Sequence, residues 1–290
     1  MSRKLASGWI DYWCNAFVPA MQVRWDRAIE EQRIPLKIRR DERDSFVDSA
    51  GMIARMDALE MATLVLPCAD VSEAARASDY ERFTTPISDM VELDSQYPRR
   101  FAGLFSIDPS LGMAGVERAA EVVARPGFVG LHLHTHSWDR PFDHRDLYPF
   151  YALADDLDIP IIVQAGTSGG RMASECGRPI GIDRPALYFG GLRFVLSHTG
   201  WPWVDEAMAM ALKHPNVYLG TAAYPPHHWS PELIRFIGGA GRGKVLMGTS
   251  FPVVGHRQAL TRLAELELRD EDGSELVAGA ARRVFSRLEP

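Results

Sequence analysis

Histidines near the ends of apolar segments are the residues of this chain that could transfer protons. His132, His134 and His136 alternate along one predicted strand, and His198 ends another. Alternate side chains of a strand project from one face, and an imidazole with an ordinary pKa near 6.5 exchanges protons at neutral pH. We therefore expect His198, His132 and His134 to be catalytic, as general acid and general base. One or two of the three on that strand could instead be hydrogen-bonded core histidines.

Other side chains at the ends of apolar segments are expected to line the same pocket. Trp13 offers an apolar or stacking wall. Ser250 would act as a nucleophile only with a histidine within hydrogen-bond reach. Arg171 could pair with a substrate carboxylate in bidentate fashion, or it could be a solvated charge. The predicted substrate-binding residues are Trp13, Asn15, Gln164, Tyr224, Ser250 and Arg171.

Short apolar segments that alternate with helical patterns predict an α/β fold with a parallel sheet. Eight strands in 290 residues indicate one distorted (β/α)8 TIM barrel that forms a single domain over residues 1–290. A doubly wound sheet is the alternative, but no Gly-x-Gly-x-x-Gly turn follows the first strand. The predicted strands are 8–14, 61–67, 101–107, 129–136, 159–165, 193–198, 216–221 and 244–248.

Helical patterns separate most of these strands, and two long connections could be lids or flexible excursions. The connections are 17–45 and 166–191, the second rich in Gly, Arg and Pro. In such a barrel the catalytic groups lie at the carboxyl ends of the strands, which is where the histidines fall. The predicted helices are 113–124, 147–157, 204–213, 231–237, 258–266 and 274–285.

Composition limits the classes of partner. A net charge of −6 argues against nucleic acid as the main partner. No run of 18 apolar residues occurs and the amino terminus lacks an apolar signal core, so we expect no membrane span and no secretion. Three widely spaced cysteines suit a reducing compartment. We expect a cytoplasmic protein that acts on a small-molecule substrate and uses no cofactor. A monomer and a homo-oligomer both stay open.

Motifs along the whole chain resemble the amidohydrolase-2 family. That family includes aminocarboxymuconate-semialdehyde decarboxylase, resorcylate decarboxylases and a pyrone-dicarboxylate lactonase. The resemblance implies a metal-dependent-hydrolase-like barrel and an enzyme acting on a small organic molecule. Its motifs lie at 99–109, 130–134, 142–151, 159–166, 198–203, 214–219 and 246–252.

The departures from the family pattern concern its metal ligands. Members usually open with Asp-x-His-x-His, whereas this chain has Trp13 and Asn15 at the two histidine positions. Gln164 stands in place of a histidine and Ser250 in place of an aspartate, while His198 matches the family's catalytic histidine. Tryptophan cannot bind a metal, and neutral side-chain oxygens are weak ligands. We therefore expect no metal at the family's site. A relocated site that combines fourth-strand histidines with His198 is the alternative.

The resemblance and the departures leave three hypotheses for function. The first is a metal-independent hydrolase of a lactone, ester or acyl compound that uses histidine acid/base catalysis. The second is a carbon–carbon lyase on the same fold: a decarboxylase, a retro-aldolase or a cyclase. The third is a pseudoenzyme that binds a ligand and catalyses nothing. The sequence does not separate hydrolysis from lyase chemistry.

Overall fold

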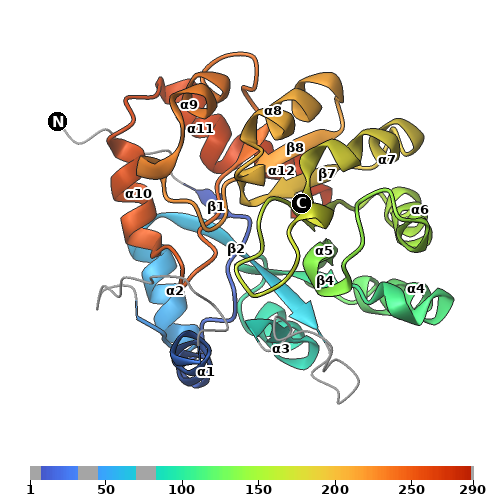
Figure 1. The fold of residues 1–290 in the computed structure, drawn as a ribbon. Helices are drawn as coiled ribbons and strands as arrows, with labels where there is room; N and C mark the ends of the chain where they lie inside the picture. Colours follow the sequence, from blue (N-terminus) through green and yellow to red (C-terminus); the bar gives the residue numbers. More distant parts are fainter. Residues whose placement is uncertain (1–7, 32–44, 70–82, 289–290) are drawn as a thin grey trace.

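The computed structural model describes residues 8–31, 45–69 and 83–288, and it has a parallel sheet surrounded by helices (Figure 1). The strands pair in the order β1-β2-β4-β5-β6-β7-β8-β9, and the short β3 pairs with β2. The fold class expected from the sequence is confirmed. The strands are β1 Trp9–Asp11, β2 Met61–Ala69, β3 Thr85–Pro86, β4 Phe101–Ser106, β5 Phe128–Leu133, β6 Ile161–Gln164, β7 Phe194–Ser197, β8 Val217–Gly220 and β9 Val245–Leu246.

Backbone hydrogen bonds just beyond β1 and β9 join the two ends of the sheet. The Tyr12 N–H donates to the Met247 carbonyl at 3.1 Å, and the Ser250 N–H donates to the Trp13 carbonyl at 2.8 Å. They complete the ring of the barrel and bring the carboxyl ends of the first and last strands together.

Alternate strand residues divide between an inner and an outer core. Val65 belongs to the inner cluster, while its neighbours Leu64 and Leu66 belong to the outer one, which the helices cover. The inner cluster also takes in Ala280 and Phe285, at the carboxyl-terminal helix. The helices are α1 Pro19–Glu30, α2 Ser49–Ala58, α3 Ile87–Gln96, α4 Met113–Val123, α5 Thr135–Trp138, α6 Tyr148–Asp156, α7 Asp183–Tyr188, α8 Val204–Lys213, α9 Pro231–Ile237, α10 His256–Ala264, α11 Asp270–Ser274 and α12 Ala280–Val284.

Several predicted boundaries are wrong. The strand predicted at 129–136 ends at Leu133, because the chain then turns into α5. The long connection at 17–45 contains α1, and its residues 32–44 lie outside the described part; the connection at 166–191 contains α7. The helix predicted at 274–285 opens as a π-helical segment over Glu275–Gly279. In the described ranges no helix is long and apolar enough to cross a membrane.

Candidate active site

His132 is the last but one residue of β5 and faces the interior of the barrel. Its neighbours Leu131 and Leu133 pack in the outer core, as the alternation predicted, so the imidazole lies on the inner face. The ring is 1% exposed, and its centroid lies 4.5 Å from that of Trp13 in an edge-to-face arrangement. Its Nδ1 is 2.9 Å from the hydroxyl of Ser106, which pairs with it from β4.

His134 and His136 lie beyond the strand, in contrast to the expectation of three histidines on one strand. His134 caps α5: its Nδ1 accepts from the Ser137 N–H at 3.2 Å and also contacts the Ser137 hydroxyl. His136 lies on α5 and its Nε2 donates to the Gly166 carbonyl at 2.9 Å. The helical turn nevertheless keeps the rings together, with centroids 6.2 Å apart for His132 and His134 and 5.7 Å apart for His134 and His136.

His198 approaches the same cluster from the end of β7. It begins a short 3-10 helix, His198–Gly200, and has a left-handed backbone with φ of 60°. Its ring centroid lies 6.3 Å from that of Trp13. Its Nδ1 is 2.5 Å from the hydroxyl of Ser197. The structure therefore brings His132 and His198 beside Trp13, with His134 next to His132.

Burial makes these four imidazoles neutral at neutral pH. Desolvation lowers the pKa of His132 and His134 well below the ordinary value, and neighbouring histidines lower it further. Desolvation also lowers the pKa of His136 and, together with repulsion from His136, lowers that of the half-buried His198 to about 3. The ordinary pKa near 6.5 that the sequence suggested for them therefore does not hold in the protein without substrate, while their use as acid and base stays a prediction.

Several polar atoms around the histidines are buried and lack a hydrogen-bond partner within the described residues. They include Trp13 Nε1, a donor, Gln164 Oε1, an acceptor, and His136 Nδ1. Gln164 ends β6 on the same face as the inner-core residue Ile162. A buried polar atom without a partner costs free energy, so such atoms in a pocket indicate a place for a ligand.

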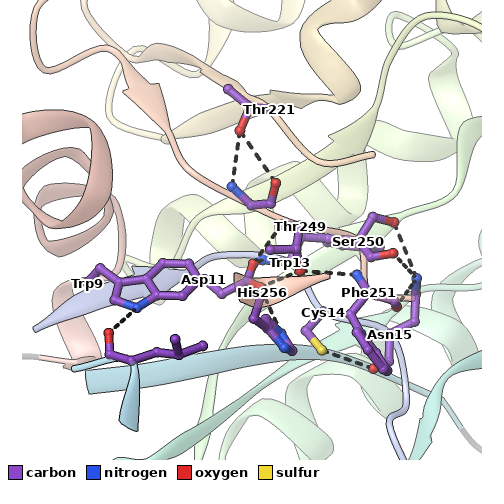
Figure 2. Close-up of polar contacts among 12 residues, drawn as sticks. Trp9, Asp11, Trp13, Cys14, Asn15, Thr221, Thr249, Ser250, Phe251 and His256 are labelled. Carbon is purple, nitrogen blue, oxygen red and sulfur yellow. Dashed lines mark hydrogen bonds and ion pairs between the residues drawn. The ribbon is translucent and has the colours of Figure 1, made fainter. Parts of the chain in front are cut away.

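Asn15 and Ser250, also predicted to bind substrate, hold the barrel closed (Figure 2). The Asn15 amide nitrogen donates to the Ser250 carbonyl and hydroxyl, each at 3.2 Å, and to the Phe251 carbonyl at 2.9 Å. The Ser250 hydroxyl forms no hydrogen bond to a histidine in the described ranges, so the condition for a nucleophilic role is not met. The amide nitrogen of Asn15 is therefore committed to structure.

Tyr224 and Arg171 lie farther out. Tyr224 is half-buried, bonds to the Thr167 side chain, and has its ring centroid 6.1 Å from that of the exposed Trp201. Trp201 follows His198 by three residues, and binding of a substrate by Tyr224 stays a prediction. Arg171 is exposed, and its pairing with a substrate carboxylate stays a prediction.

The sequence did not predict which side chains form hydrogen bonds to the histidines. Ser106, Ser137 and Ser197 each bond to the Nδ1 atom of a histidine, and Tyr12 bonds to Ser197. Ser197 could have been identified from the sequence, because it directly precedes His198. Asp11 is the last residue of β1. It is fully buried, accepts from the hydroxyl of Thr249 at 2.5 Å, and lies 3.4 Å from His256 (Figure 2).

The residues present do not fit the divalent metal that the family pattern implies. Trp13 occupies a position where the family has a metal ligand, and its ring packs against His132. The Asn15 amide nitrogen donates hydrogen bonds to the neighbouring carbonyls. Over the described part of the chain no group of three or more His, Cys, Asp or Glu side chains could hold a metal ion. The relocated site has no such group among these residues either.

A cavity of about 420 Å³ opens at the opposite end of the barrel. Phe101 and Phe128, the first residues of β4 and β5, line it together with Arg125 and Arg287. Arg287 donates to the Val123 and Phe128 carbonyls there. This cavity is separate from the histidine pocket at the carboxyl ends of the strands.

A family model described as an amidohydrolase, Amidohydro_2, matches residues 10–287. The chain belongs to this family. The match includes the histidine pocket as well as the divergent positions Trp13, Asn15, Gln164 and Ser250. The resemblance inferred from the motifs is confirmed.

Solved structures share the barrel. An uncharacterised TIM-barrel protein from Bordetella bronchiseptica matches with a TM-score of 0.76 and 21% identity, over 98% of this chain and all of its own. A 2,6-dihydroxybenzoate decarboxylase in complex with 2,6-dihydroxybenzoate has a TM-score of 0.70 and 14% identity, over 97% and 100%. A 5-carboxyvanillate decarboxylase from Novosphingobium aromaticivorans, complexed with manganese, has a TM-score of 0.69 and 16% identity, over 99% of each chain. At such identities these matches establish the fold.

Proposed function

We propose that this amidohydrolase-family protein is a carbon–carbon lyase that decarboxylates a small aromatic acid without a protein-bound metal. The observation that carries the proposal is a pocket of neutral imidazoles around Trp13, where a buried indole N–H and a buried amide oxygen lack partners. Structural relatives that decarboxylate hydroxylated benzoates support it by analogy.

The pocket suits a carboxylate because its donors are polar but uncharged. A negative charge within about 4–6 Å favours the charged form of an imidazole and raises its pKa. The bound acid would therefore convert a histidine that is neutral in the free protein into a proton donor. Trp13 would pack against the aromatic ring of the acid, and its N–H would bond to an oxygen.

We assign proton delivery to His132. Its Nδ1 lies 2.9 Å from the hydroxyl of Ser106, which can accept as readily as it donates, so both ring nitrogens of His132 can hold a proton. The proton passes to the ring carbon that bears the carboxylate. The bond from that carbon to the carboxylate breaks, its electron pair restores the aromatic ring, and carbon dioxide leaves. His132 then takes its next proton from solvent.

Hydrolysis of an ester or lactone is the second candidate, since a neutral His132 could take a proton from water. The test uses chelator-treated protein with 2,6-dihydroxybenzoate and other hydroxybenzoates labelled at the carboxylate, and with a panel of aryl esters and lactones. Release of labelled carbon dioxide supports the lyase. Hydrolysis alone makes the protein a hydrolase, and binding without turnover of any compound makes it a pseudoenzyme.

Variants link the activity to the pocket. We expect His132→Gln and His198→Gln each to lower turnover by roughly 10²-fold or more with little change in Tm. The matched control is His144→Gln, because His144 lies half-buried beside Asp146, outside the pocket, and should leave turnover unchanged. Full activity in both pocket variants would contradict the proposal.

A further inference from the structure

Tyr12 is a fully buried tyrosine that occupies a slot made by two glycines inside the barrel. A Cβ at Gly220 would lie 2.1 Å from the Tyr12 hydroxyl oxygen, and a Cβ at Gly248 would lie 2.4 Å from its ring. Any larger residue at these positions would exclude the phenol. The two glycines therefore leave room for a polar group in an otherwise apolar inner core.

The hydrogen bonds around the Tyr12 hydroxyl have a fixed direction. Its oxygen accepts from the backbone N–H of Ala222 at 3.4 Å and from the backbone N–H of His198. Burial raises the pKa of the phenol, so the proton stays on the oxygen. Since a backbone N–H can only donate, the phenol proton points to the remaining neighbour, the Ser197 hydroxyl, at 3.3 Å.

The donor-to-acceptor direction of these hydrogen bonds continues from Tyr12 through Ser197 to His198. The Ser197 oxygen accepts from Tyr12, so its own proton points to His198 Nδ1, 2.5 Å away. A neutral imidazole that accepts at Nδ1 carries its proton on Nε2. We propose that Tyr12 and Ser197 are positioning residues that hold His198 as the Nε2–H tautomer, so that His198 donates a hydrogen bond to an oxygen of the bound acid.

The tautomer of His134 is set in the same way, but by a direct hydrogen bond from the backbone. Its Nδ1 accepts from the backbone N–H of Ser137, so its proton also lies on Nε2. Together with Trp13 Nε1, the pocket then presents three N–H donors whose direction the fold sets, and a ligand rich in oxygen acceptors fits them. The contact with an acid rests on the proposed function, whereas the tautomer of His198 does not.

The direct test is NMR of the full chain labelled with ¹⁵N-histidine, because the two neutral tautomers have distinct nitrogen shifts. Wild-type protein should show His198 as the Nε2–H form. Tyr12→Phe keeps the ring that fills the glycine slot but removes the proton, and should give a mixture of tautomers. Ser106→Ala is the matched control, since it removes a hydroxyl from His132 and should leave the His198 signals in place. A wild-type Nδ1–H form, or an unchanged tautomer in Tyr12→Phe, overturns the proposal.

Ligand binding gives a second readout. With 2,6-dihydroxybenzoate as the probe, Tyr12→Phe and Ser197→Ala should each raise Kd about tenfold, the effect of one hydrogen bond to a charged group. Ser197→Thr, which keeps the hydroxyl, should restore most of the affinity. Unchanged affinity in both variants overturns the assignment of His198 as a donor. Failure of the proposed function is distinguishable, because the protein would then decarboxylate nothing while the tautomer result still held.

Discussion

Replacing His132 by glutamine should flatten the dependence of stability on pH. The native protein keeps His132 neutral because burial lowers its pKa, helped by the neighbouring His198, whereas the unfolded chain binds a proton near the ordinary pKa of about 6.5. The unfolded state therefore holds more protons below that pH. The stabilising contribution is complete above pH 6.5 and is lost as the pH falls toward the folded-state pKa.

The magnitude follows from the proton count. At pH 5.5 an unfolded histidine is about nine-tenths protonated, and one proton corresponds to about 1.36 kcal/mol per pH unit, so His132 contributes a slope of about 1.2 kcal/mol per pH unit. Between pH 7 and pH 5 the wild type should lose about 1.9 kcal/mol more than His132→Gln.

Urea unfolding followed at half-unit steps from pH 5 to pH 7 measures this difference. Gln164→Ala is the control, because it alters the same pocket without removing a titrating group. It should shift the free energy of unfolding at every pH and keep the wild-type slope. An equal slope in wild type and His132→Gln would refute the reasoning, since His132 would then carry the same charge in both states.

Three further predictions concern the closure of the barrel, the packing inside it and the metal. Asn15→Ala should lower the free energy of unfolding by about 2 kcal/mol in urea titrations, because it removes the donor to three oxygens near Ser250; unchanged stability would mean that these bonds do not hold the ring closed. Gly220→Ala should cost about 3 kcal/mol through its clash with Tyr12, and Tyr12→Ala in the same chain should recover part of the loss in Tm if that clash is the cause. Protein purified without added metal should contain far less than one equivalent of zinc, manganese or iron, and chelators should leave its Tm unchanged; a stoichiometric ion would reveal a relocated site.

The barrel could be predicted because each strand is a short apolar segment followed by a helical pattern. That rule failed at β5. Residues 129–136 alternate in polarity as a strand does, yet the side chain of His134 captures the N–H of Ser137 and starts a helix. A local cap overrode the longer pattern, which is a common limit of periodicity arguments.

The sequence predicted which residues form the pocket better than it predicted their protonation. His132, His134 and His198 lie at one end of the barrel, because the carboxyl ends of its parallel strands share that end. The burial that lowers their pKa comes from tertiary packing, which includes the Trp13 ring against His132 and His198. The role of Tyr12 could not be predicted, because its polar partner Ser197 lies 185 positions away in the sequence.

Closure of the ring also determines when the barrel can fold during synthesis of the chain. Asn15 and Ser250 lie 235 positions apart, so the first strand leaves the ribosome long before the segment that completes its hydrogen bonds. At typical rates of 5–20 residues per second the wait is about 10–50 s. During that time the inner faces of the early strands lack their final neighbours and are open to aggregation. A nascent chain therefore has no closed ring until β9 and Ser250 have been synthesised, and binding of a ligand can report that the ring has closed.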